Sequence, residues 1–190
     1  ACLAAMNVFE GSFLYSFMKH VSKWVYAKAD VLTYSSKRFQ GYLKKVHNID
    51  VPDEWYMPQF ADDVFSEPLP VKETTAEKQL VFAGNIGKVQ ALEVLIQAAD
   101  LLRDDPVHWH IVGDGSNYAN CFELTEKLGL KEKITFYGRK PLEQMPSYYA
   151  MADAMLVSMR NDLSVNDTLP GKVQSYMAAG KPVLGSIAGE

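Results

Sequence analysis

The feature that most constrains this chain is a regular alternation of apolar runs and amphipathic segments from Gln79 onward. Short runs typical of buried strands lie at 80–83, 109–112, 134–137, 154–157 and 182–184, and segments with helical periodicity lie between them at 89–102, 117–128, 144–150 and 172–179. Strands that alternate with helices form right-handed βαβ units around a parallel sheet. The sequence therefore predicts an α/β fold with a doubly wound, Rossmann-like parallel sheet.

The first third of the chain repeats this pattern on a smaller scale. Residues 12–28 carry apolar side chains at three- and four-residue spacing, which predicts an amphipathic helix. A second predicted helix at 36–46 lies between short predicted strands at 31–34 and 55–57. We interpret residues 1–57 as the C-terminal part of a separate α/β domain.

The segment 58–77 interrupts the pattern with proline, threonine and acidic residues. Proline breaks periodic elements, so we predict a linker here, although the same composition suits a long surface loop within one domain. Residues 78–190 then form the second α/β domain. Because the chain lacks an initial Met and stops just after the last predicted strand, we expect a fragment with a truncated second domain.

Charge and cysteine content narrow the class of partner. The formal net charge is −4, which gives no reason to expect a nucleic-acid partner. Cys2 and Cys121 lie far apart and form no Cys-x-x-Cys pair, so neither a disulfide framework nor a zinc site is indicated. No run approaches the roughly 20 apolar residues that span a bilayer. We expect a cytoplasmic protein.

Glycine-rich turns follow two of the predicted strands of the second domain, at the edge where such sheets bind ligands. Gly84, Asn85 and Gly87 precede Lys88 at a helix start, an arrangement that suits a diphosphate but also an ordinary tight turn with a solvated lysine. Gly113 and Asp114 begin a Gly-Asp-Gly turn that is equally common at strand–helix junctions.

Two further segments carry cations to the same edge. Gly138 is followed by Arg139 and Lys140, which suit a phosphate or a base, or simply solvent. The loop 161–171 holds Asp162, Asn166 and Asp167, then Gly171 and Lys172 at the start of the last helix. Free N–H groups at that helix start and the Lys172 ammonium predict an anion site, and the carboxylates suit sugar hydroxyls. The alternative is a polar loop with a lysine at a helix start.

A metal site is not predicted. His108 and His110 share a strand face, but the sequence offers no third ligand beside them and no Asp-x-Asp pair. We expect neither a metal nor another cofactor.

Taken in order, these segments resemble one family. VFAGNIGK (81–88), LE (92–93), HIVGDG (110–115), ITFYG (134–138) and AAGKPV (178–183) look like glycosyl transferase group 1, the retaining family with the GT-B fold. The resemblance covers about residues 78–190, and residues 12–65 resemble the end of that family's acceptor domain and the crossing into its donor domain. GNIGK together with PGKVQSYMAAGKP is most similar to transferases that build bacterial surface polysaccharides.

The resemblance implies a nucleotide-sugar donor, expected to be UDP-linked, and a glycan or lipid-linked acceptor, with no metal required. It implies that Lys88, Asp167 and Lys172 act in catalysis. Donor-binding residues implied at the motif positions are Gly84, Asn85, Gly87, Gly113, Asp114, Gly138, Arg139, Gly171, Ser175 and Glu190. We expect the fragment alone to be inactive, because the acceptor is chosen mainly by the first domain.

The sequence departs from the family at three positions. Asn85 stands near the place where many members have an arginine that pairs with the lysine at 88. The usual pair of Glu residues, with seven residues between them, falls on Asp167 and Ser175, and a serine cannot supply the carboxylate that commonly holds the ribose. Glu190, after the last predicted strand, is the candidate substitute.

Two other functions fit the same residues. A nucleotide-sugar 2-epimerase shares the GT-B architecture and needs no acceptor. A non-catalytic nucleotide-sugar-binding subunit is suggested by the missing acid at Ser175.

Two interpretations of the first predicted helix remain open. It combines Lys19, Lys23 and Lys28 with aromatic residues, so it suits either peripheral contact with the inner membrane face or packing against the rest of the first domain.

Overall fold

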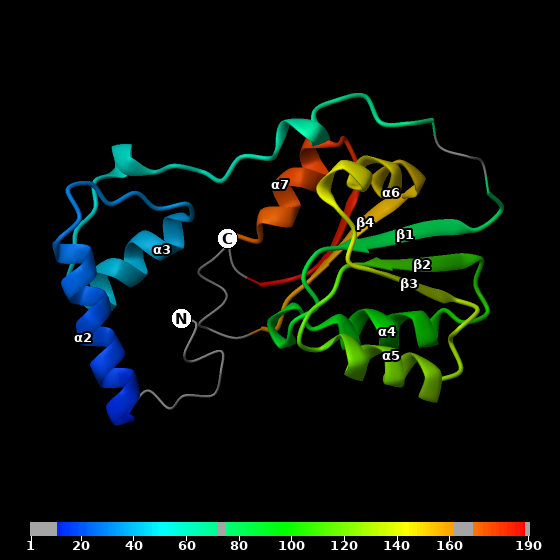
Figure 1. The fold of residues 1–190 in the computed structure, drawn as a ribbon, viewed down its shortest axis with the longest axis horizontal. Coiled ribbons are helices and arrows are strands. Elements are labelled where there is room, and N and C mark those ends of the chain that lie inside the picture. Colours follow the sequence, from blue (N-terminus) through cyan, green and yellow to red (C-terminus); the bar gives the residue numbers. More distant parts are fainter. Residues whose placement is uncertain (1–10, 72–74, 162–168, 189–190) are drawn as a thin grey trace. The chain divides into compact units, whose positions relative to one another are not determined.

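The computed structural model describes residues 11–71, 75–161 and 169–188, and these divide into two compact units (Figure 1). The first unit is formed mainly by residues up to Gln59. The second comprises residues from Phe60 to Arg160 and from Pro170 to Ile187. Residues of the predicted linker from Phe60 onward therefore group with the second unit. Within that stretch Phe65 is 3% exposed and stacks on Tyr149, so part of the segment is packed chain.

The second unit is built on a five-stranded parallel sheet with the strand order β3-β2-β1-β4-β5. The strands are β1 (Lys78–Ala83), β2 (Val107–Val112), β3 (Ile134–Gly138), β4 (Ala154–Ser158) and β5 (Val183–Ser186). Each overlaps a predicted strand. The chain winds outward from β1 in both directions, which confirms the predicted doubly wound, Rossmann-like α/β fold.

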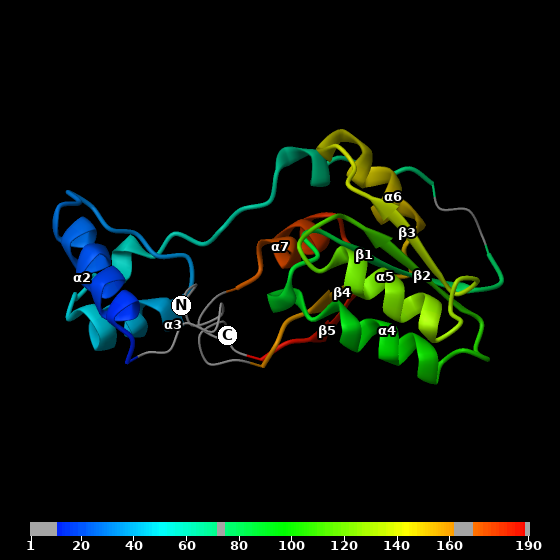
Figure 2. The same cartoon turned by 60° about the horizontal axis from the view of Figure 1, so that its bottom comes forward.

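Helices cover both faces of this sheet (Figures 1 and 2). One face carries α4 (Leu92–Leu101) and α5 (Tyr118–Lys127), and the other carries α6 (Met145–Met151) and α7 (Gly171–Ala178). Because side chains alternate along a strand, Phe82 of β1 joins the core beneath α4 and α5, whereas Val81 and Ala83 join the core beneath α6 and α7. The two cores explain the apolar runs in the sequence.

The helix expected from residue 89 begins later than predicted. Lys88–Gln90 forms a single 3-10 turn, and Ala91 then adopts a φ of 47° before α4 starts at Leu92. The Gln90 side chain accepts a hydrogen bond from the N–H of Gly87 at 3.1 Å, which closes the turn on itself. Periodicity could not reveal this break, because the apolar pattern runs through it.

The first unit is small and mostly helical. It contains α2 (Phe13–Ala27), α3 (Lys37–Tyr42), a π-helical turn at Leu43–His47 and a 3-10 turn at Asp53–Trp55. The predicted helices 12–28 and 36–46 are confirmed by α2 and by α3 with the turn that follows it. Tyr34, Leu43 and Val51 form its buried centre.

The two strands predicted in this unit are wrong. Tyr34 and Tyr56 form only an isolated parallel bridge, in which Tyr34 accepts from the N–H of Met57 at 2.9 Å. The 3-10 turn ends directly before Tyr56, and Pro58, which lacks an N–H, follows Met57. Too few consecutive residues are left to extend the ladder.

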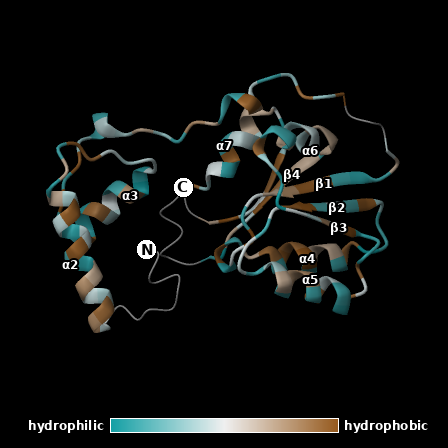
Figure 3. Cartoon of the chain, viewed as in Figure 1, coloured by the Kyte–Doolittle hydropathy of each residue, from teal (hydrophilic) through white to brown (hydrophobic). Residues whose placement is uncertain are grey.

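Helix α2 exposes its apolar side chains. None of its residues is buried, and Phe13 and Trp24 are 87% and 64% exposed. Figure 3 shows hydrophobic residues, in brown, alternating with hydrophilic ones, in teal, along this helix. This exposure fits both alternatives stated for the helix. No helix in the described ranges is long and apolar enough to cross a membrane.

Candidate functional site

A pocket of about 400 Å³ lies at the carboxyl ends of β1, β2 and β3, within the second unit. This is the edge at which doubly wound sheets bind their ligands. Its lining combines backbone-rich turns with charged side chains. The lining residues are Gly84, Asn85, Val112, Gly113, Asp114, Gly115, Arg139, Lys140 and Met145.

The floor of the pocket is two glycines whose backbones almost touch. Gly84 and Gly113 adopt φ values of 142° and 146°, a region that L side chains rarely occupy. A Cβ on Gly113 would lie 1.8 Å from the carbonyl oxygen of Gly84. The N–H of Gly84 donates to Val112 and that of Gly113 to Gly138, each at 2.9 Å. Three strand ends are thereby drawn together around a surface of bare backbone.

Two loops are then locked to each other above this floor. Ile86 donates its N–H to the carbonyl of Asp114 at 2.8 Å, and its own carbonyl accepts from Asn117 at 2.9 Å. Gly115 completes the contact, because a Cβ there would lie 2.5 Å from the carbonyl oxygen of Ile86. The loops after β1 and β2 therefore form one preorganised unit rather than two independent turns.

Lys172, in the first turn of α7, is the most unusual side chain near the pocket. Its Nζ is buried and, in the part of the chain that the structure describes, has no hydrogen-bond partner. The Nζ lies 3.7 Å from the centroid of the Phe82 ring, within the range of a cation–π contact. A Cβ built on Gly84 would be 3.1 Å from it. Burial lowers the pKa of Lys172 to about 7.

Tyr176 fixes α7 to the strand that carries Gly84. Strand β4 pairs with β1 only at Leu80 and Val81, so the backbone of Ala83 has no ladder partner on that side. The Tyr176 hydroxyl takes its place: it accepts from the Ala83 N–H at 3.0 Å and donates to the Ala83 carbonyl at 2.9 Å. Tyr176 is fully buried, and burial raises its pKa above the normal range for a phenol.

The structure brings several predicted site residues together and leaves others apart. Gly84, Asn85, Gly113, Asp114 and Arg139 line the pocket. Gly138 accepts the hydrogen bond of the Gly113 N–H through its carbonyl oxygen and has a φ of 67°. Asp162, Asn166, Asp167 and Glu190 lie outside the described residues, so their predicted roles stay predictions.

Five other predicted residues in the described ranges are not in the pocket lining: Gly87, Lys88, Gly171, Lys172 and Ser175. Lys88 is exposed on the 3-10 turn after Gly87. Gly171 is the first residue of α7, and Ser175 is half-buried one turn further on. Their contacts with a donor stay predictions.

Four contributors were missed by reasoning from the sequence. Phe82 lies under Lys172, Tyr176 ties α7 to β1, Gln90 holds the turn at Gly87, and Met145 lines the pocket. Tyr176 follows Lys172 by four residues, which places both on one face of a helix. This four-residue spacing is the sequence signal that could have linked Tyr176 to the site.

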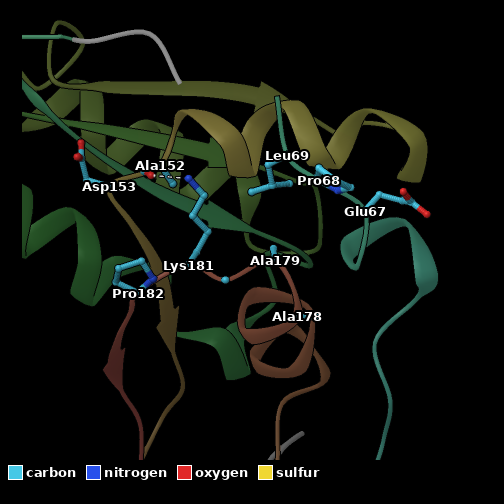
Figure 4. Close-up of a pocket in the computed structure, with 10 residues that line it drawn as sticks. Glu67, Pro68, Leu69, Ala152, Asp153, Ala178, Ala179, Lys181 and Pro182 are labelled. Carbon is cyan, nitrogen blue, oxygen red and sulfur yellow. Dashed lines mark hydrogen bonds between the residues drawn. The ribbon is translucent and has the colours of Figure 1, made fainter. Parts of the chain in front are cut away.

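A second pocket, of about 530 Å³, lies at the opposite edge of the sheet (Figure 4). Ala152 and Asp153 precede β4, and Pro182 precedes β5, so it opens at the amino ends of the strands. The Lys181 side chain points to the carbonyls of Ala150 and Ala152, to which it donates at 3.0 Å each. We interpret this pocket as a structural junction.

The two strand histidines are structural. His110 is hydrogen-bonded to the Tyr137 hydroxyl at 2.8 Å and to the side-chain amide oxygen Oε1 of Gln79 at 2.6 Å, and His108 is hydrogen-bonded to the Thr135 hydroxyl at 2.8 Å. Burial lowers the pKa of His110 to about 4, so it is neutral at physiological pH. Among the described residues no group of three His, Cys, Asp or Glu side chains is placed to hold a metal ion.

Comparison with known proteins agrees with this geometry. Residues 67–189 match the family described as "Glycosyl transferases group 1". The "Putative colanic acid biosynthesis glycosyl transferase WcaI" of Escherichia coli K12 is 33% identical over 104 residues, 55% of this chain and 25% of the relative. The "Probable glycosyltransferase WbjE" of Pseudomonas aeruginosa is 23% identical over 184 residues, 91% of this chain and 44% of the relative. The chain thus spans less than half the length of both.

Solved structures share the fold at lower identity. Anabaena Alr3699/HepE in complex with UDP-glucose superimposes with a TM-score of 0.69 at 16% identity, over 90% of this chain and 49% of that protein. Sucrose-phosphate synthase from Thermosynechococcus elongatus gives a TM-score of 0.69 at 20% identity, over 92% and 45%. With the family match over most of the second unit and the glycine-lined pocket at the expected sheet edge, the chain belongs to the glycosyl transferases group 1 family.

Proposed function

We propose that the protein is a retaining glycosyltransferase whose second unit binds a nucleotide-diphosphate sugar, most favourably a UDP-sugar. The acceptor is a glycan or a lipid-linked glycan in surface polysaccharide biosynthesis, a role suggested by the name of the Escherichia coli relative. The observation that carries the proposal is the Lys172 Nζ, buried without a partner beside the bare backbone of Gly84. A diphosphate would supply the oxygen acceptors that this Nζ does not find within the described residues.

The charges around the pocket support this ligand. Arg139 and Lys140 follow β3 and line the pocket, and α7 directs the free N–H groups of its first turn toward its N-terminal end, where Lys172 lies. Cations and N–H donors that are in place before the reaction stabilise the charge that develops on a leaving diphosphate. Holding the donor sugar in position also lowers the entropy cost of reaching the transition state. The chemistry proposed for this unit is therefore binding, orientation and charge stabilisation.

Calorimetric titration with UDP, GDP and ADP tests the binding step. We expect UDP to bind and Lys172→Met to weaken it by at least about tenfold, the effect of losing one charge-assisted hydrogen bond. Lys127→Met, which removes an exposed lysine at the end of α5, is the matched control and leaves affinity unchanged. Failure of all three nucleotides to bind contradicts the proposal.

A second test concerns turnover and the role proposed for Lys88. In the full-length enzyme we expect Lys88→Ala to lower transfer at least about 100-fold, in line with the loss of one group that stabilises a leaving charge. Unchanged transfer removes Lys88 from the catalytic set. Following the donor by NMR without acceptor separates transfer from epimerisation, because only an epimerase changes the sugar under that condition.

A further inference from the structure

The free site holds Lys172 in an environment that disfavours a charge. Lysine side chains normally extend so that the ammonium reaches water. Here the chain turns inward, and its Nζ lies against the Phe82 ring with no hydrogen-bond acceptor in the described structure. An ammonium buried without a hydrogen-bond acceptor is strongly unfavourable, and contact with an aromatic ring offsets only part of this cost, so a group in this position tends to lose its charge.

The charged groups on the surrounding elements do not offset this burial. Lys88 follows β1, Arg160 follows β4, and Arg139 and Lys140 follow β3, all of them cationic. Among the described residues, the Asp114 carboxylate at this edge accepts the N–H of Gly115 at 2.7 Å, and the exposed Asp63 lies on the 3-10 turn Asp63–Phe65 that packs against α7. The first turn of α7 contains no acidic residue, and its N-terminal end is itself the positive end of the helix.

In the part of the chain that the structure describes, a further ionisable group on α7 is the Tyr176 phenol. It is neutral and engaged with the backbone of Ala83. Burial is accordingly the cause that lowers the pKa of Lys172 to about 7.

We propose that the free site keeps Lys172 largely as a neutral amine and that binding of the donor diphosphate protonates it, so that donor binding takes up a proton from solvent. The inference rests on the proposed function of this pocket. The Nζ lone pair accepts the proton from water or buffer, and the resulting ammonium donates its N–H groups to diphosphate oxygens. No bond of the donor is broken in this step.

Such coupling has a defined pH dependence. Above about pH 7 the amine must gain a proton for the diphosphate to bind well, so donor affinity falls by up to about tenfold per pH unit. Below that pH the amine is already charged and affinity levels off. A lysine that stays charged throughout gives a flat profile from pH 6 to pH 9.

Proton uptake can be measured directly by titrating the protein with UDP-glucose in buffers of different ionisation enthalpy. This donor lacks a terminal phosphate that titrates near pH 6, so the protein supplies the signal. We expect uptake of about 0.9 proton at pH 8 and about 0.1 at pH 6, from the fraction of neutral amine at each pH. Lys172→Arg, whose guanidinium stays charged, should bind UDP-glucose with no uptake. Binding without uptake overturns the inference alone, whereas absence of UDP-glucose binding overturns the proposed function as well.

A second measurement needs no ligand. Lys172→Met removes the buried amine, so its melting temperature should exceed that of the unsubstituted protein by about 5 °C more at pH 7 than at pH 9.5. The sign follows because the unfolded lysine is charged below its usual pKa, while the buried one resists protonation down to about pH 7. Lys127→Met controls for loss of a surface charge. An increment that is equal at both pH values shows an ordinary charged lysine and refutes the inference.

Discussion

Substitution of Gly113 by alanine should be the most damaging single-methyl change in the second unit. The added Cβ would lie 1.8 Å from the Gly84 carbonyl oxygen, whereas Cβ atoms essentially never approach non-bonded atoms within 3.0 Å. The two strand ends would have to separate by about 1.2 Å, the difference between those distances. Held at a φ of 146°, the alanine also adds backbone strain of about 1–3 kcal/mol. With about 1–3 kcal/mol for the displaced packing, we expect a loss of about 2–6 kcal/mol in the free energy of unfolding.

Gly129→Ala provides the matched control. Gly129 has a φ of 71° at the end of α5, yet nothing lies within 4 Å of its added Cβ, so only backbone strain of about 1–2 kcal/mol applies. Guanidinium unfolding followed by circular dichroism compares the two variants with the parent protein. We also expect Gly113→Ala to lose nucleotide binding and Gly129→Ala to keep it. If Gly113→Ala is no more destabilised than Gly129→Ala, the close approach of the two strand ends is refuted.

Three further predictions concern buried polar groups. Tyr176→Phe leaves the Ala83 N–H and carbonyl unpaired and should lower the free energy of unfolding by about 1–3 kcal/mol, more than Tyr149→Phe does in the same urea titration. Because burial lowers the pKa of His110 to about 4, the native state resists protonation that the unfolded state accepts below about pH 6.5. Stability should therefore fall by up to about 3 kcal/mol between pH 6.5 and pH 4 relative to His110→Gln, and parallel pH profiles of the two proteins would contradict this. Burial raises the pKa of Cys121 to about 12. In a Cys2→Ser variant, the Cys121 thiol should therefore react with a disulfide reagent at pH 8 only after denaturant is added. Rapid reaction of the native protein would disprove the burial of this thiol.

The second unit was largely predictable because local pattern and tertiary structure agree there. Each strand of the sheet overlaps an apolar run bounded by turn residues. The central strands β1, β2 and β4 contribute buried side chains to the cores, as such runs indicate, whereas the edge strand β5 is mostly exposed. Gly84 and Gly113 were predicted as site residues from their place after strands, and both line the pocket. Glycine directly after a strand indicates a backbone conformation or a close approach that other residues cannot adopt. The prediction was therefore confirmed at both positions.

What could not be predicted depends on contacts between distant segments. Lys172 was expected at a helix start, but nothing in the sequence pairs it with Phe82, which lies 90 positions earlier on the other face of the sheet. The strands expected around Tyr34 and Tyr56 failed for the opposite reason. Their residues favour strands locally, but a turn and a proline left room for a single bridge.

The contact between Tyr176 and Ala83 has a consequence for how this site tolerates sequence change. The phenol is bonded to the backbone of Ala83, not to its side chain. Position 83 can therefore accept any residue other than proline that fits the surrounding volume without altering these two hydrogen bonds. Position 176 is more restricted, because only a hydroxyl at the end of a side chain of this length can both accept a hydrogen bond from the Ala83 N–H and donate one to the Ala83 carbonyl. The position of the Lys172 Nζ relative to the glycine turn therefore depends mainly on one tyrosine, and side-chain substitutions along β1 leave it unchanged.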